Sequence, residues 1–181
     1  EDRTWIARSP IPEVMFGLDF NFKWRGFDAV LFFQGATNTE IMLCGTYSAL
    51  GYSDGTYYTQ AFKWGSNPPK YLVEGSWTPD HTDASYPRLS TQSSPNNVYT
   101  SDFWARDASY LRLKNVQLGY TFPKTVTRKF YVDALRLYVS ASNVFTISGL
   151  SALGIDPEAP SVNNGYYPQQ RVVSLGASLT F

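Results

Sequence analysis

Acidic side chains in the segments rich in glycine and proline are the first residues that could do chemistry. Two carboxyl groups held close together can act as general acid and base, or as acid and nucleophile, on a glycosidic bond. Acidic residues in such segments more often form turns or carry solvated charge, so we expect no catalytic carboxylate pair. The four acids considered are Asp80, Asp83, Asp156 and Glu158.

The histidine and cysteine content limits other kinds of site. His81 is the only histidine, so neither a histidine-based metal cluster nor a Ser-His-Asp triad can form within the chain. Cys44 is the only cysteine, which rules out an internal disulfide, and we expect it to be a buried thiol. The glycines are scattered at turns and form no phosphate-binding loop. We therefore expect no enzyme, no metal and no cofactor.

Aromatic side chains in the irregular segments are the candidates for binding. A flat aromatic ring can stack on a sugar ring, and the same side chains are common in protein–protein contacts. A third interpretation is that these rings pack the loops against one another. The residues concerned are Tyr57, Tyr58, Trp64, Trp77, Trp104, Tyr166 and Tyr167.

Five stretches alternate between apolar and polar or small residues, which is the period of a β-strand. Residues 16–24 carry four aromatic residues and a leucine on one side, and residues 172–181 alternate in the same way and end on an aromatic residue. The alternation shifts by one near Lys114–Asn115, which predicts a β-bulge. A barrel strand facing lipid and a strand of a soluble sandwich both fit one such stretch. The expected strands are approximately 14–24, 27–36, 109–122, 134–146 and 170–181.

The connections between these strands differ in length in a regular way. Those after the first and third strands are short, whereas those after the second and fourth, approximately 37–107 and 147–168, are long. Outer-membrane barrels have short periplasmic turns and long extracellular loops, and a soluble sandwich has no reason to sort its loops. The pattern favours an antiparallel transmembrane β-barrel with Phe181 on the periplasmic side. The basic residues of the second short link, expected in a solvated turn, are Lys124, Arg128 and Lys129.

The composition of the whole chain limits the remaining possibilities. Its 181 residues carry no net charge, so nothing indicates a nucleic-acid-binding surface. No run of about 18 apolar residues occurs, which excludes a transmembrane helix but not barrel strands. Five strands leave two open edges, which do not survive in lipid, so we expect a slice of a larger barrel or a piece that pairs with another chain. The chain starts at Glu1 without a signal peptide, as expected of a mature product or a fragment.

A series of motifs supports this interpretation. The clearest is Ala-Ser-Tyr-Leu-Arg-Leu-Lys-Asn-Val-Gln-Leu-Gly-Tyr at residues 108–120. The others are residues 11–13, 26–28, 32–35, 77–79, 86–89, 135–146, 154–158 and 167–171. In this order they resemble the C-terminal region of the SusC/RagA family of TonB-linked outer-membrane transporters.

The resemblance implies that the chain is the final part of a barrel of about 22 strands in the bacterial outer membrane. Such transporters import oligosaccharides or, in some branches, peptides. A SusD-like lipoprotein covers the barrel as a lid, and the TonB complex supplies energy through an N-terminal plug and TonB box, which are absent from this sequence. The remaining barrel strands and outer-membrane lipid would be the other partners.

The same framework assigns roles to particular residues. The loop aromatics would contact the substrate or the lid, unless they pack the loops together. Phe181 would carry the signal for assembly into the membrane. The polar residues expected to face the lumen are Asp19, Asn21, Lys23, Asp28, Gln34, Arg136 and Tyr138.

Two alternative functions remain open at this stage. One is a soluble β-sandwich module that binds glycans through the loop aromatics. The other is a secreted enzyme, which ranks last because no catalytic cluster is present. Importers of glycans and of peptides would share these strands, so the choice of cargo depends on the loops.

Overall fold

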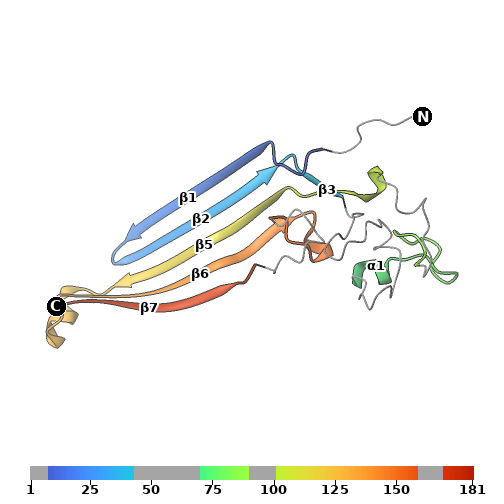
Figure 1. The fold of residues 1–181 in the computed structure, drawn as a ribbon. Coiled ribbons are helices and arrows are strands. Elements are labelled where there is room, and N and C mark those ends of the chain that lie inside the picture. The colour runs from blue at the N-terminus through green and yellow to red at the C-terminus, as the bar shows by residue number, and fades with distance from the viewer. Residues whose placement is uncertain (1–7, 43–69, 90–100, 159–168) are drawn as a thin grey trace, which may run out of the picture.

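A five-stranded antiparallel sheet is the largest unit of the described structure (Figure 1). The computed structural model describes residues 8–42, 70–89, 101–158 and 169–181. The strand order is β1-β2-β5-β6-β7, so each strand pairs with its neighbour in this order and β1 and β7 form the two edges. The expected antiparallel β class is therefore confirmed. The strands are β1 (Val14–Trp24), β2 (Phe27–Thr37), β5 (Tyr110–Thr121), β6 (Ala134–Ser148) and β7 (Val172–Thr180).

A two-residue turn joins β1 to β2. Arg25 and Gly26 both have positive φ, at 45° and 90°, as the tight turns of twisted hairpins require. The Gly26 carbonyl accepts a hydrogen bond of 2.7 Å from the Thr121 N–H. A Cβ at Gly26 would lie 2.7 Å from the Thr121 carbonyl oxygen, so the glycine lets the turn pack closely on the end of β5.

The register of the ladders divides the sheet into two faces. Residues that pair directly across an antiparallel ladder lie on the same face, and the pairs Leu18↔Phe33, Ala29↔Leu118 and Val139↔Leu175 carry one apolar face across all five strands. The opposite, polar face carries most of the charged and hydroxyl side chains of the strands. The apolar face includes Phe16, Leu18, Phe20, Phe22, Trp24, Phe27, Leu31, Phe33, Leu113, Val116, Leu118, Tyr120, Leu137, Val139, Phe145, Val173, Leu175 and Leu179.

The bulge expected in the third predicted strand is confirmed. In the ladder with β2, Phe32 pairs with Asn115 and Phe33 pairs with Leu113, so Lys114 is the extra residue. In the ladder with β6, two residues of β6, Asn143 and Val144, lie opposite Lys114, so the extra residue of that ladder is on β6. Because of this residue, Leu113 and Val116 lie on the same face although three positions separate them. The bulge thus explains the change of parity in the sequence.

The two ends of the sheet differ. At the turn end, β1–β2 and β5–β6 are joined by short connections, the second of which contains α3 (Lys124–Thr127) and η4 (Arg128–Phe130). At the loop end, the long connections β2–β5 and β6–β7 leave the sheet (Figure 1). The loop end also holds a small ladder that the alternation did not predict. This ladder pairs β3 (Glu40–Met42) with β4 (Ala105–Asp107). The helices at the loop end are α1 (Lys70–Glu74), η3 (Asp102–Trp104) and η5 (Ser151–Leu153).

The buried apolar residues gather at the loop end. We call this group the loop cluster. Its side chains come from β3, α1, η3 and the segments beside them, which lie far apart in the sequence. By contrast, most of the large side chains on the apolar face of the sheet are exposed. The loop cluster consists of Ile41, Leu72, Tyr86, Trp104, Ala108 and Leu150.

Helices make up a small part of the residues that the structure describes. In the described ranges, none is long and apolar enough to span a membrane.

Candidate functional site

An ion pair crosses the polar face near the turn end. The Arg136 guanidinium on β6 donates from Nε to Asp28 Oδ1 at 2.9 Å and from Nη2 to Asp28 Oδ2 at 2.5 Å. Asp28 is on β2, so the pair passes over β5, which lies between the two strands. The strand residue beneath it is Gly119, where a Cβ would lie 2.6 Å from both partners. The absence of a side chain at Gly119 therefore allows this two-pronged contact to form.

Tyr138 extends this arrangement toward β7. The Arg136 guanidinium carbon lies 4.9 Å from the centre of the Tyr138 ring, which is a cation–π contact. The hydroxyl end of the ring lies over Gly176 on β7, so that a Cβ there would overlap it. Long polar side chains thus alternate with glycines along this row. The result is a polar surface that rises little above the backbone.

A second charged group ties the long β6–β7 connection to the sheet at the loop end. We call it the loop anchor, and its centre is Arg112 on β5, whose side chain is 3% exposed. Arg112 donates to Asp156 at 2.5 Å, to Glu158 at 3.0 Å and to Thr146 Oγ1 at 2.8 Å. Lys114 also contacts Glu158, at 2.7 Å. Two cations and two carboxylates balance within the anchor, as buried charges require.

The loop anchor corrects one expectation from the sequence. Asp156 and Glu158 were expected to form turns or to carry solvated charge. Asp156 does form a turn, because its Oδ1 accepts a hydrogen bond of 3.0 Å from the Glu158 N–H. Both carboxylates are nevertheless largely buried and ion-paired. Their partner Arg112 lies more than forty positions away in the sequence, and only the folded sheet brings it to them.

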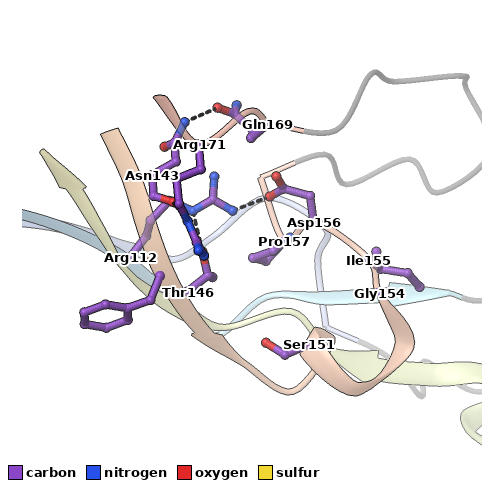
Figure 2. Close-up of a pocket in the computed structure, with 11 residues that line it drawn as sticks. Arg112, Asn143, Thr146, Ser151, Gly154, Ile155, Asp156, Pro157, Gln169 and Arg171 are labelled. Atoms are coloured by element: carbon purple, nitrogen blue, oxygen red, sulfur yellow. Dashed lines mark hydrogen bonds and ion pairs between the residues drawn. The ribbon is translucent and has the colours of Figure 1, made fainter. Parts of the chain in front are cut away.

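A polar pocket of about 420 Å³ lies beside the loop anchor, where β6 separates from β7 (Figure 2). Asn143, at the edge of the pocket, has a positive φ of 51°. Its side-chain amide donates to Gln169 Oε1 at 3.2 Å and to the Gln170 carbonyl at 3.0 Å. The pocket is lined by Arg112, Asn143, Phe145, Thr146, Ser151, Gly154, Ile155, Asp156, Pro157, Gln169 and Arg171.

The chemistry of this pocket is hydrogen bonding. Its amides and hydroxyls can donate and accept, and its buried guanidinium, that of Arg112, is paired with carboxylates. The exposed Arg171 donates to the Asn143 carbonyl at 3.5 Å. Such a surface suits ligand groups that form hydrogen bonds. Within the described parts of the chain, no group of three or more His, Cys, Asp or Glu side chains could hold a metal ion.

The seven residues expected to face a lumen all lie on the polar face of the sheet. The register places each of them opposite the exposed aromatic and aliphatic residues of its strand. Gln34 also contacts the Tyr110 hydroxyl, at 3.5 Å. The set is Asp19, Asn21, Lys23, Asp28, Gln34, Arg136 and Tyr138. Phe181 follows β7 at the turn end and is exposed.

The aromatic loop residues divide into different environments. Trp104 is 2% exposed, stacks on Tyr86 with 6.2 Å between ring centres and meets Phe103 edge-on at 4.9 Å. For this residue the structure favours packing between loops over contact with a ligand. Trp77 is exposed and accessible to a ligand or partner. The residues that lie outside the described ranges are Cys44, Tyr57, Tyr58, Trp64, Tyr166 and Tyr167.

Three other titratable groups at the loop end lie in different environments. His81 and Asp83 form an exposed pair at 3.7 Å. Hydrogen bonds from the hydroxyl and backbone N–H of Ser109 hold the pKa of Asp107 below its usual value. Burial raises the pKa of Tyr71 to about 12, so this phenol stays neutral at physiological pH and cannot serve as a base.

Known proteins similar to this chain are TonB-dependent receptors. The receptor P3 of Formosa agariphila is 29% identical over 97% of this chain and 17% of its own length. SusC of Bacteroides thetaiotaomicron is 27% identical over 98% of this chain and 16% of its own length. A solved structure of the RagAB peptide transporter matches with a TM-score of 0.67 and 25% identity, over 97% of this chain and 18% of that one. No protein-family model matches. The chain therefore spans less than one fifth of these relatives.

Proposed function

We propose that this chain, a segment of a TonB-dependent receptor of the SusC and RagA type, forms the C-terminal part of the barrel wall of an outer-membrane importer. The observation that carries the proposal is the apolar face of the sheet, which is continuous over five strands and exposed. A soluble sandwich buries such a face against a second sheet. In a membrane, acyl chains cover it instead.

The dimensions of the strands support a membrane location. A strand needs about 9–11 residues to cross the hydrocarbon core when it is tilted. β1 and β2 each have 11 residues, and β7 has 9. The longer β6, with 15 residues, extends beyond this length toward the loops. The sheet is therefore long enough to cross a bilayer without any helix.

The edges of the sheet support the view that the remainder of the receptor completes the barrel. Among the residues that the structure describes, β1 pairs only with β2 and β7 only with β6. An unpaired strand edge in hydrocarbon leaves backbone N–H and C=O groups without partners, at a cost of several kcal/mol for each group. The remaining barrel strands would pair with these edges, and the plug and the TonB box would lie in the same missing part.

The loop end supplies the orientation and the partners. Long connections face outward and short turns face the periplasm in barrels of this kind, so the loop cluster, the loop anchor and the polar pocket would lie at the outer mouth. A SusD-like lipoprotein would cover this end, with Trp77 among the exposed residues available to it or to cargo. The TonB complex would act at the opposite end through the missing plug.

The two charged groups suggest how the segment serves passage of cargo. The flat row of Asp28, Arg136 and Tyr138 would keep the lumen wall polar without narrowing it. The loop anchor would hold the β6–β7 connection at the mouth, and the pocket beside it would offer hydrogen bonds to polar groups. Oligosaccharides carry many hydroxyls and peptides many amides, and both suit such a surface. The cargo would be one of these two classes.

Fractionation of the full-length receptor tests the proposal. We expect the receptor to co-purify with outer membranes, to need detergent, and to migrate differently on a denaturing gel before and after heating. Recovery of the receptor as a folded, monomeric protein in buffer without detergent would contradict the proposal and favour a soluble glycan-binding module.

Removal of Phe181 tests the assembly role within the same experiment. The aromatic residue that directly follows β7 would take part in recognition by the membrane-insertion machinery. We expect its deletion to abolish the heat-sensitive band, whereas Phe181→Tyr keeps an aromatic ring and should assemble. Normal assembly of the deletion variant would show that Phe181 is not needed for assembly.

A further inference from the structure

The connection between β5 and β6 exposes apolar side chains in an unusual setting. Phe130 is 72% exposed and Tyr131 is 93% exposed, and Val126 is exposed beside them. The Tyr131 backbone, at the end of η4, has a positive φ of 56°. Few residues other than glycine adopt this conformation. At the loop end, by contrast, Tyr86 and Trp104 are buried. Burial in the protein therefore does not explain the apolar residues of this turn.

The same connection is strongly basic. Three cations are interspersed with the apolar residues, and all are exposed. Asp133 is the only acid between the end of β5 and the start of β6, so the turn carries a net positive charge. Exposed aromatic and aliphatic residues interleaved with cations are typical of segments that lie at a membrane surface. We call this group the turn patch: Lys124, Val126, Arg128, Lys129, Phe130 and Tyr131.

The turn patch continues an aromatic row at the end of the strands. The rings of Phe27 and Tyr120 lie 4.5 Å apart, and those of Tyr120 and Phe122 lie 5.0 Å apart. Phe122 directly precedes Pro123, after which α3 begins. Along the chain, an apolar face is therefore followed by aromatic rings and then by cations. Acyl chains, interface and phosphate groups follow one another in this same order at a bilayer surface.

We propose that the turn patch lies in the head-group layer of the periplasmic leaflet and binds the phosphate groups of anionic phospholipids. The inference rests on the proposed function, which sets this end of the sheet at the periplasmic boundary. The aromatic and aliphatic side chains insert at the interface, and Lys124, Arg128 and Lys129 provide the charge that complements the phosphates. The patch thereby anchors the β5–β6 connection to the membrane surface.

The test uses the full-length receptor in vesicles of phosphatidylcholine with or without phosphatidylglycerol. Thr125, which is exposed between Lys124 and Val126, is replaced by cysteine and labelled with an environment-sensitive fluorophore. Cys44 and any other cysteine of the receptor are replaced by serine. Quenching is then measured with phosphatidylglycerol or phosphatidylcholine spin-labelled at the head group. We expect stronger quenching by phosphatidylglycerol.

Two triple variants then examine the charges. Each cation near the surface is worth roughly a fivefold preference for anionic lipid, so K124Q/R128Q/K129Q should reduce the preference by on the order of a hundredfold. R8Q/K70Q/R88Q removes three exposed cations at the loop end and should leave it unchanged. Equal quenching by both lipids in the unsubstituted receptor would overturn the inference. A label shielded from both would show that protein covers the patch, which also overturns it.

The heat-shifted gel band separates this inference from the proposed function. If the receptor shows the band but no lipid preference at Thr125, only the turn-patch inference fails. If the unsubstituted receptor shows no band, the barrel assignment fails and the inference fails with it. A preference that K124Q/R128Q/K129Q retains would also overturn the role of these cations.

Discussion

The loop cluster and the apolar face of the sheet contain the same kinds of side chain, but these side chains are buried in the cluster and mostly exposed on the sheet. In the loop cluster, Trp104 and Leu72 are almost completely buried. On the sheet, Leu175 is 86% exposed, and the aromatic residues of β1 are exposed along the strand. The loop cluster therefore behaves as the core of a protein in water. Under the proposed function, the exposed apolar face of the sheet would lie against acyl chains.

The charged residues show the reverse contrast. Arg112 is buried in the loop anchor with three protein partners, whereas Arg136 on the polar face of the sheet is 26% exposed and pairs with Asp28 alone among the acids that the structure describes. Under the proposed function, the polar face lines a wet passage and the loop end forms a compact structure above the membrane. Each part thus has its polar and apolar groups arranged for its own surroundings.

The largest effect is expected from the loop anchor. Arg112→Met would leave Asp156 and Glu158 with buried charge and no guanidinium, which costs about 3–5 kcal/mol. We expect loss of amide hydrogen-exchange protection in residues 149–158 of the assembled receptor. Arg88→Met, at an exposed position, should change protection by less than about 0.5 kcal/mol. Unchanged protection in Arg112→Met would mean that the anchor does not hold the loop.

A comparable loss is expected when the loop cluster is truncated. Trp104→Ala removes a buried ring and leaves a cavity, at a cost of about 3–5 kcal/mol. Phe22→Ala on the apolar face should cost less, because acyl chains can fill the space and no cavity remains. Denaturant unfolding of both variants in detergent measures the difference. Equal losses would indicate that Phe22 packs against protein.

A charge on the apolar face tests directly what that face contacts. Leu175→Lys should destabilise the assembled receptor by about 2–4 kcal/mol if the residue meets the bilayer interior. Ser174→Lys, one residue earlier and on the polar face, should be nearly neutral. Refolding into vesicles and titration with denaturant give both values. A neutral Leu175→Lys would place water at this face, because exposed surface substitutions usually change stability by less than about 0.5 kcal/mol.

The smallest effect is expected on the polar face. Gly119→Ala would place a methyl group against the Asp28–Arg136 pair, and such overpacking costs about 1–3 kcal/mol. The cost should shrink when Arg136→Ala is added, because the crossing side chain is then gone. A double-mutant cycle of unfolding free energies measures this coupling. Additive effects would show that Gly119 does not accommodate the pair.

The positions of the strands and their two faces could be predicted from the sequence. The alternation in β1 and β7 depends only on neighbours two positions apart, and the observed strand bounds lie within two residues of the expected ranges. The sequence predicts the Arg25–Gly26 turn and the bulge at Lys114 for the same reason. Backbone geometry imposes these patterns locally, so no tertiary information was needed to find them.

The tertiary structure alone decided which residues meet across the sheet and the loops. Arg112 reaches Asp156 and Glu158, and Arg136 reaches Asp28 across β5, through register and loop packing between distant segments. The burial of Trp104 and the pairing of β3 with β4 likewise depend on segments far apart in sequence. Local sequence patterns do not predict such contacts, because the contacts form only when folding brings segments that are distant in sequence next to one another.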